Sequence, residues 1–184
     1  MLAGDLHTQL VTAGARLAAA GLVRASEGNL SARIDNRHCL VTPTGGVTGR
    51  LTGADLVEVP LDGGKMPRRA TSEVRMHIEI YRGRPDVEAV VHAHPPWVLR
   101  LAREGRLPDP RFLDEDHTPF GRVVEVAFFE EGSTALAKSA AAALREATSC
   151  VLFDHGAVCI GATVEIALRR MLRLERAAAR TGWL

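Results

Sequence analysis

The sequence predicts a single α/β domain in which helices flank a central mixed, largely antiparallel sheet. Short β-branched runs and long amphipathic runs both occur, without the regular strand–helix–strand alternation of a parallel sheet. The length of 184 residues suffices for one sizeable core. No linker, internal repeat or low-complexity tract divides the chain, so the domain is expected to span 1–184.

The first third of the chain is predicted to form one helix followed by a meander of short strands. Apolar residues recur at helical spacing from Leu6 to Ala20, and Gly21 is a suitable stop. The glycine-rich segment 44–56 is expected to be mostly loop, with Thr52 capping a short helical turn. Strands are expected within 28–34, 38–43 and 56–65.

The remaining elements alternate irregularly between helix and strand. Segment 71–82 is predicted to be a helix with Thr71 or Ser72 as its N-cap and with His77 and Tyr81 on its apolar stripe. Pro95-Pro96 prevents the preceding strand from simply continuing. Segment 101–122 shows no regular pattern. Strands are expected at 87–94 and 123–129 and as a pair within 149–161, and helices at 133–147 and 163–180.

Composition favours a cytoplasmic protein with a small-molecule partner. The net charge of +1 gives no electrostatic reason to expect nucleic acid or an anionic membrane as a partner. No run of 18 apolar residues occurs, and the N-terminus resembles a helix rather than a signal peptide. Cys39, Cys150 and Cys159 lie among apolar neighbours, which favours buried free thiols in a reducing compartment.

Three histidines are candidate metal ligands. His92 and His94 project from the same face of a predicted strand, and imidazoles so placed can share a zinc ion at about 2.0–2.1 Å. His155, in the turn beside Gly156, would complete the open three-ligand arrangement of a catalytic site. Taken alone, the pair also suits two ordinary histidines at a strand end, and His155 suits a turn residue. His117, in the irregular segment, stays open as a ligand.

A catalytic carboxylate and an anion site are expected beside these histidines. Glu73 could act as the proton-transferring base, although a helix-start glutamate or a partner of His77 is also consistent with its position. Hydroxyls at a helix start and glycine turns with accessible N–H groups are suited to phosphate. The candidate phosphate-binding residues are Gly28, Asn29, Thr44, Gly45, Thr71 and Ser72.

Five segments in this order resemble the class II aldolase/adducin family: "EGNLSARI", "LVTPTGG", "TSEVRMH", "VVHAHP" and "FDHGA". The resemblance extends over about residues 6–180, nearly the whole chain. The family's enzymes include fuculose-phosphate aldolases and ribulose-phosphate 4-epimerases. The resemblance implies that His92, His94 and His155 bind zinc or another divalent ion, that Glu73 is the acid/base, and that the six residues above form the phosphate pocket.

The implied reaction is cleavage of a small ketose phosphate, similar to L-fuculose 1-phosphate, into dihydroxyacetone phosphate and an aldehyde through an enediolate. Glu73 favours the aldolases, because the 4-epimerases carry an aspartate there. A 4-epimerase, a dehydratase or a decarboxylase on the same metal site remains an alternative, as does a non-catalytic adducin-like interaction module. The resemblance also implies a homotetramer.

One departure concerns the second proton donor. The fuculose-phosphate aldolases carry a tyrosine in the segment after the histidine pair, where this chain reads "RFLDEDHTPFG". Its only tyrosine, Tyr81, falls in a predicted helix. The replacement donor would be Asp114, Glu115, Asp116 or His117, although a solvated acidic loop explains the same stretch.

Overall fold

A seven-stranded sheet crosses the computed structural model, which describes residues 5–113 and 120–183. The strand order is β3-β2-β1-β4-β7-β6-β5, and every neighbouring pair is antiparallel except the parallel pair β5–β6. This confirms the mixed, largely antiparallel sheet, while the domain bounds 1–184 stay a prediction. The strands are β1 Asn29–Arg33, β2 His38–Val41, β3 Val57–Pro60, β4 Ala89–Ala93, β5 Val123–Val126, β6 Ser149–Leu152 and β7 Gly156–Gly161.

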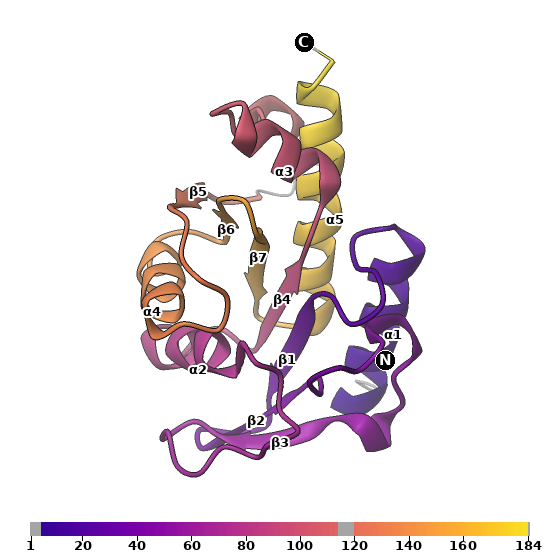
Figure 1. Ribbon diagram of the computed structural model, residues 1–184, viewed down its shortest axis with the longest axis vertical. Helices are drawn as coiled ribbons and strands as arrows, with labels where there is room; N and C mark the ends of the chain where they lie inside the picture. The colour runs from indigo at the N-terminus through magenta and orange to yellow at the C-terminus, as the bar shows by residue number, and fades with distance from the viewer. Residues whose placement is uncertain (1–4, 114–119, 184) are drawn as a thin grey trace.

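Helices cover both faces of the sheet (Figure 1). On one face, α1 (Leu6–Ala19), α3 (Pro96–Arg103) and α5 (Val164–Thr181) pack into one apolar core. On the other face, α2 (Val74–Gly83) and α4 (Thr134–Ala143) form a second core with the sheet. Short 3₁₀ turns occur at Thr48–Arg50, Gly53–Asp55 and Pro110–Phe112. Two cores separated by a sheet are the expected layered arrangement.

One helix was not predicted and the start of another is wrong, whereas strand β4 does end before Pro95-Pro96 as predicted. Helix α3 was not predicted, because Pro95-Pro96 reads as a stop; in fact Pro96 occupies its first turn, where proline lacks only an N–H that would have no partner anyway. Helix α2 begins at Val74, and Glu73, rather than Thr71 or Ser72, holds the N-cap position. The segment before it forms a turn in which the Val74 N–H donates to the Thr71 carbonyl at 3.1 Å.

At the centre of the sheet, the end of strand β4 lies next to the turn between β6 and β7. Strand β4 is buried along its whole length and pairs with β1 on one side and β7 on the other. Its register sets His92 opposite Asn29 of β1 and Val158 of β7. The turn between β6 and β7 therefore lies beside the end of β4, which places His155 near the two histidines of that strand end.

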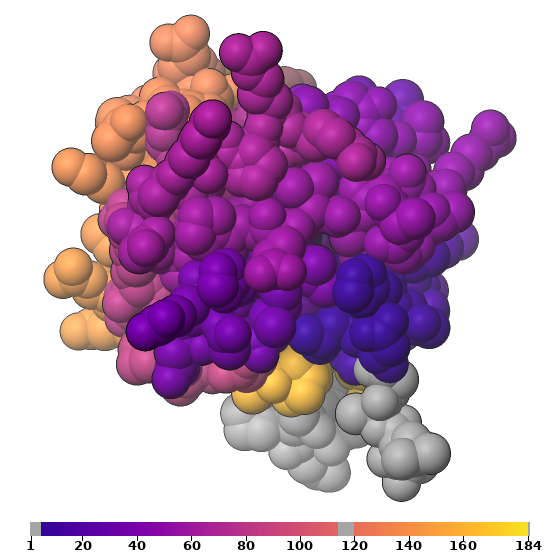
Figure 2. All heavy atoms as spheres, turned by 90° about the horizontal axis from the view of Figure 1, so that it is seen from below, coloured from indigo at the N-terminus to yellow at the C-terminus, as the bar shows by residue number. Residues whose placement is uncertain are grey.

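The three cysteines have the environment that the sequence predicts. Cys39, Cys150 and Cys159 are buried free thiols, as predicted, and burial raises the pKa of each. A cytoplasmic location stays a prediction. Within the described residues, no helix is long and apolar enough to cross a bilayer. Figure 2 shows one end of the molecule, where the N-terminal half of the chain forms most of the visible surface.

Candidate metal centre

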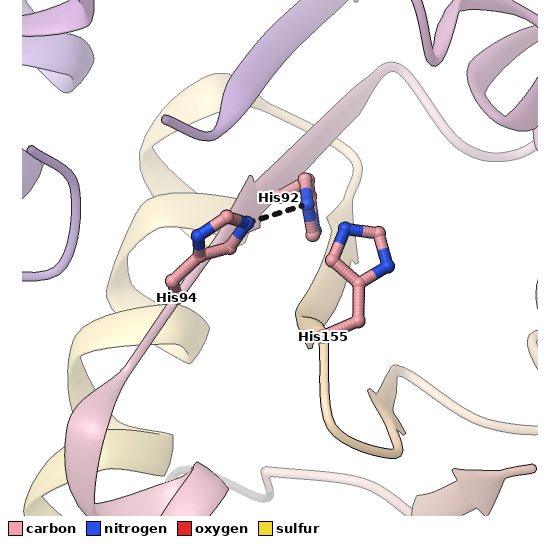
Figure 3. A group of neighbouring side chains, drawn as sticks. All are labelled: His92, His94 and His155. Carbon is pink, nitrogen blue, oxygen red and sulfur yellow. Dashed lines mark hydrogen bonds between the residues drawn. The ribbon is translucent and has the colours of Figure 1, made fainter. Parts of the chain in front are cut away.

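Three imidazoles converge at the end of β4 (Figure 3). The ring centroids of His92, His94 and His155 are 4.8–5.5 Å apart, and one nitrogen from each lies within 4.8 Å of the other two. The Nε2 atoms of His92 and His94 are 3.3 Å apart. His92 and His155 are buried, and His94 is partly exposed. Such a group can hold a divalent ion and leave a coordination position open.

The protonation of His92 suits a ligand. Its Nδ1 lies 3.0 Å from the carbonyl oxygen of Ala157. Because a carbonyl can only accept, Nδ1 carries a proton, so Nε2 is the atom that would bind a metal once it has lost its own proton. A backbone acceptor behind a ligand imidazole is the arrangement that fixes tautomer and ring orientation in metal sites.

Gly156 leaves the space into which the rings fit. A Cβ at this position would lie 2.6 Å from the Ala93 carbonyl oxygen, 2.7 Å from Cε1 of His92 and 2.9 Å from Cδ2 of His94. These separations are far below van der Waals contact, so the side chain of any other residue would displace the rings or the strand. The three-nitrogen cluster therefore depends on glycine directly after His155.

Glu73 reaches the same cluster from α2. Its Oε2 lies 3.1 Å from Nε2 of His92 and accepts a hydrogen bond of 2.8 Å from Nδ2 of Asn29. Its Oε1 lies 3.5 Å from Nε2 of His155 and is buried without a hydrogen-bond partner among the described residues. A buried carboxylate oxygen without a partner is costly, and a cation held by the imidazoles would satisfy it. The residues present therefore fit a metal ion.

The charges of this cluster depend on one another. Burial alone would raise the pKa of Glu73, but attraction to His92 and the hydrogen bonds from His92 and Asn29 hold it well below its ordinary value. Burial would lower the pKa of His92, yet the Glu73 carboxylate raises it. Burial and repulsion by His92 lower the pKa of His94, and they lower that of His155 to about 4. Glu73 is thus an anion at neutral pH.

The residues predicted to bind phosphate differ in how accessible they are to a ligand. Gly28 adopts a positive φ of 66° and lies against the His92 carbonyl, and Gly45 also has a positive φ, of 68°. Ser72 is exposed, and its hydroxyl forms no hydrogen bond within the described part of the chain. Gly45 and Ser72 are open to a ligand, whereas Gly28 packs closely against Val23 and the His92 carbonyl.

Three other predicted contacts are already engaged. The Thr71 N–H, expected to be free, donates to the Thr42 carbonyl at 3.1 Å, and the Thr44 N–H donates to the Arg69 carbonyl at 2.8 Å. Both backbone donors are therefore unavailable to phosphate. The Thr44 hydroxyl remains, and the Thr71 hydroxyl, whose oxygen accepts from the Glu73 N–H at 3.3 Å, can still donate. The Asn29 amide contacts Glu73 and also His77, whose Nε2 lies 2.6 Å from Asn29 Oδ1. Asn29 therefore bridges Glu73 and His77, in place of the direct pairing that their spacing also permitted.

Two acidic residues near the centre escaped the sequence analysis. Oε1 of Glu131 lies 3.7 Å from Nε2 of His155, and Oε2 of Glu27 lies 3.9 Å from Nδ1 of His94. Glu27 is the first residue of the quoted segment "EGNLSARI", and Glu131 lies just before the α4 cap at Ser133, but neither position indicated a place at the centre. The four donor candidates at 114–117 (Asp114, Glu115, Asp116 and His117) lie outside the described residues.

Known proteins match nearly the whole chain. Residues 8–181 match the family model "Class II Aldolase and Adducin N-terminal domain". A 5-methylthioribulose-1-phosphate/5-deoxyribulose-1-phosphate aldolase of Rhodospirillum rubrum is 33% identical over 175 residues, which cover 94% of this chain and 78% of that protein. A 3-oxo-tetronate 4-phosphate decarboxylase of Pectobacterium atrosepticum is 31% identical over 181 residues, covering 94% of this chain and 81% of that protein.

The fold is also shared with a solved structure. The L-fuculose-1-phosphate aldolase of Thermus thermophilus superposes with a TM-score of 0.83 at 33% sequence identity. The match covers 97% of this chain and 93% of that one. The family match over residues 8–181 includes both segments that carry the three histidines and the helix that follows Glu73.

Proposed function

The chain belongs to the class II aldolase and adducin family, and from that premise we propose that it is a zinc-dependent aldolase of small ketose phosphates. Enzymes of this family are metal-dependent lyases that act on phosphorylated sugars. The observation that carries the proposal is the approach of the Glu73 carboxylate to His92 and His155, which sets an anionic base beside a three-imidazole centre.

The proposed metal site consists of His92, His94 and His155. A divalent ion held there would polarise the substrate carbonyl and stabilise negative charge on its oxygen. The phosphate would contact the Ser72 hydroxyl, the hydroxyls of Thr44 and Thr71, and the backbone at Gly28 and Gly45. Three imidazoles accept several divalent ions, so zinc itself is part of the proposal.

In cleavage, the C3–C4 bond of the ketose phosphate breaks as the C4 hydroxyl loses its proton and becomes the aldehyde carbonyl. The bonding electron pair remains on C3 as an enediolate. Glu73, which is ionised in the free protein, takes up a proton equivalent to the one lost by the C4 hydroxyl and passes it to C3, which gives dihydroxyacetone phosphate. In the synthetic direction, ionised Glu73 removes that proton again. The low pKa of Glu73 keeps it ionised at neutral pH, which is the state that can accept this proton.

The test is carbon–carbon bond formation by the metal-loaded protein. We expect the protein to consume dihydroxyacetone phosphate in the presence of small aldehydes. It should also exchange one C3 proton of dihydroxyacetone phosphate for deuterium without an aldehyde, which NMR measures. If no aldehyde causes loss of the phosphate donor, the aldolase proposal is wrong. Deuterium exchange without aldol formation would instead indicate another enzyme that forms the same enediolate.

A decarboxylase is the second candidate, because the Pectobacterium relative is named for that activity. Loss of CO₂ from a 3-oxo-tetronate 4-phosphate leaves the same enediolate, and protonation again gives dihydroxyacetone phosphate. The two reactions differ in the departing group. Aldol cleavage needs a base for the C4 hydroxyl proton, whereas decarboxylation needs none and brings a second anion into the site.

Glu131 favours the aldolase on these grounds. Its carboxylate is exposed and lies at the centre beside His155. There it can accept the hydroxyl proton of a ketose phosphate, and it would repel the carboxylate of a 3-oxo acid. We expect Glu131→Gln to slow aldol cleavage by about tenfold or more without slowing any decarboxylation. Glu130→Gln, next to it, is the control that should change neither rate. Equal rates for the Glu131→Gln variant and the wild type would exclude Glu131 from the reaction.

Zinc binding should depend on pH. Imidazoles bind a metal only when they are neutral, and the pKa of His92 is raised above its ordinary value of 6.5 by Glu73. A proton must therefore leave as zinc binds, so affinity should rise with pH, by about tenfold per pH unit where one proton is displaced. Above the pKa of His92 it should level off. Chelator competition measures this dependence, and an affinity independent of pH from about 6 to 8 would contradict it.

Metal content also separates catalysis from an adducin-like interaction role. We expect about one zinc or other divalent ion per chain, bound by the three histidines. Less than about a tenth of an equivalent, with no activity after reconstitution, would favour the non-catalytic module. Family members are commonly oligomeric, and for this chain we propose a homotetramer, which light scattering tests.

A further inference from the structure

A row of five buried polar side chains crosses the interface between β1 and α2. Asn29 and Ser31 alternate on one face of β1, and Glu73, His77 and Tyr81 follow at intervals of four along α2. The side chains join in sequence: Glu73 to Asn29 at 2.8 Å, Asn29 to His77 at 2.6 Å, His77 to Ser31 at 2.6 Å, and Ser31 to Tyr81 at 2.7 Å.

Chemistry fixes the direction of every hydrogen bond in this row. The ionised Glu73 carboxylate only accepts, so Asn29 must present its NH₂ group to it. The Asn29 oxygen then faces His77, whose Nε2 must donate. Burial lowers the pKa of His77 to about 4, so the ring is neutral and its Nδ1 accepts from the Ser31 hydroxyl. The Ser31 oxygen in turn accepts from Tyr81.

The far end of the row is closed. The guanidinium of Arg33 lies 4.8 Å from the centroid of the Tyr81 ring and donates to the Tyr81 carbonyl. Ser31, His77 and Tyr81 are at most 2% exposed. The row therefore ends in the core and does not conduct protons to solvent; what it can do is fix orientation. Five polar groups in an apolar interface are favourable only when their hydrogen bonds are made, and the row leaves only Glu73 Oε1, at the metal centre, without a partner.

We propose that His77 is a positioning residue that locks the Asn29 amide with its NH₂ group toward the active site. One N–H of that group holds the Glu73 carboxylate, and the second remains for the substrate phosphate. The second part rests on the proposed function. With the amide reversed, its oxygen would face both the Glu73 carboxylate and the phosphate, and like partial charges would repel. One amide thus couples the proton-transferring base to the phosphate site.

The orientation can be tested without any enzyme assay. Long-range ¹H–¹⁵N spectra of the full-length protein, metal-free and zinc-loaded, report the tautomer of each histidine. We expect His77, assigned by its absence from the His77→Gln spectrum, to be neutral with the proton on Nε2. A proton on Nδ1 would require the Asn29 oxygen to face Glu73, and it would overturn the proposal whatever the substrate proves to be.

Two matched variants test the effect on the active site. Glutamine at position 77 keeps a donor near the place of Nε2, whereas asparagine provides groups only near the place of Nδ1. We expect His77→Gln to exchange the dihydroxyacetone phosphate proton within about threefold of wild type. We expect His77→Asn to lower kcat by about 10–100-fold and to raise the KM for dihydroxyacetone phosphate, because a displaced group costs up to about 10²-fold. Zinc stoichiometry should be unchanged in both.

Tyr81→Phe removes only the last donor of the row, and its exchange rate should stay within about threefold of wild type. Equal rates for His77→Gln and His77→Asn would overturn the positioning role. If His77→Asn does not fold, the tautomer and the His77→Gln rate decide. A wild-type protein that exchanges no proton would contradict the proposed function alone, and the tautomer would still decide the orientation of Asn29.

Discussion

Glutamine in place of Glu73 is expected to slow proton exchange at dihydroxyacetone phosphate by about 10²–10⁴-fold. The replacement has nearly the same shape, and its amide oxygen can still accept the hydrogen bond from Asn29. It cannot take up or deliver a proton at neutral pH. Metal binding should persist, because the three imidazoles come from the strand β4 end and the β6–β7 turn rather than from α2. Phosphate binding should persist as well.

The control for Glu73→Gln is Glu79→Gln. Glu79 lies on the same helix, but it pairs with Arg82 away from the histidines. Its replacement removes the same charge from α2, so it should leave the exchange rate within about twofold, as is usual for surface substitutions. Deuterium exchange by NMR and zinc content should be measured on both variants. Undiminished exchange in zinc-loaded Glu73→Gln would remove Glu73 from the mechanism.

Local patterns were sufficient to predict most of the elements. The β-branched run before His92 and the turn at Asp154-His155-Gly156 indicated the strands that carry the histidines, because burial and turn chemistry are local properties. Ser133 caps α4 as predicted, accepting a hydrogen bond from the Leu136 N–H. The start of α2 was misplaced, because Thr71 uses its carbonyl and hydroxyl in the preceding turn, which propensity does not reveal.

The contacts of Asn29 could not be predicted in the same way. Asn29 and Glu73 are 44 positions apart, and their hydrogen bond depends on how α2 lies across β1. Local patterns therefore assigned Asn29 one role, phosphate binding, whereas the structure shows its amide hydrogen-bonded to the Glu73 carboxylate. The sequence did contain a signal for the contact between β1 and α2. Polar residues alternate at 29 and 31 in an otherwise apolar strand, and His77 and Tyr81 fall on the apolar stripe of the helix. Buried polar residues on two facing elements suggest partners.

Alanine in place of Gly156 is expected to weaken zinc binding by about 100-fold or more, a loss of about 2.7 kcal/mol. The added methyl group would come within 2.9 Å of the rings of His92 and His94 and within 2.6 Å of the Ala93 carbonyl. Gly156 has no positive φ, so the effect is steric and the cost of overpacking should be about 1–3 kcal/mol of stability. The rings must turn away to relieve it, and activity should fall with metal occupancy.

Gly83→Ala is the matched control for this substitution. Gly83 ends α2, and a Cβ there meets nothing within 4 Å, so alanine should leave zinc affinity unchanged and stabilise the helix by up to about 1 kcal/mol. Chelator competition and thermal unfolding of both variants separate the two effects. If Gly156→Ala is destabilised but binds zinc as tightly as wild type, the turn relaxes without moving the rings. Close packing at Gly156 would then support the fold alone, and the precise approach of the three imidazoles would not depend on it.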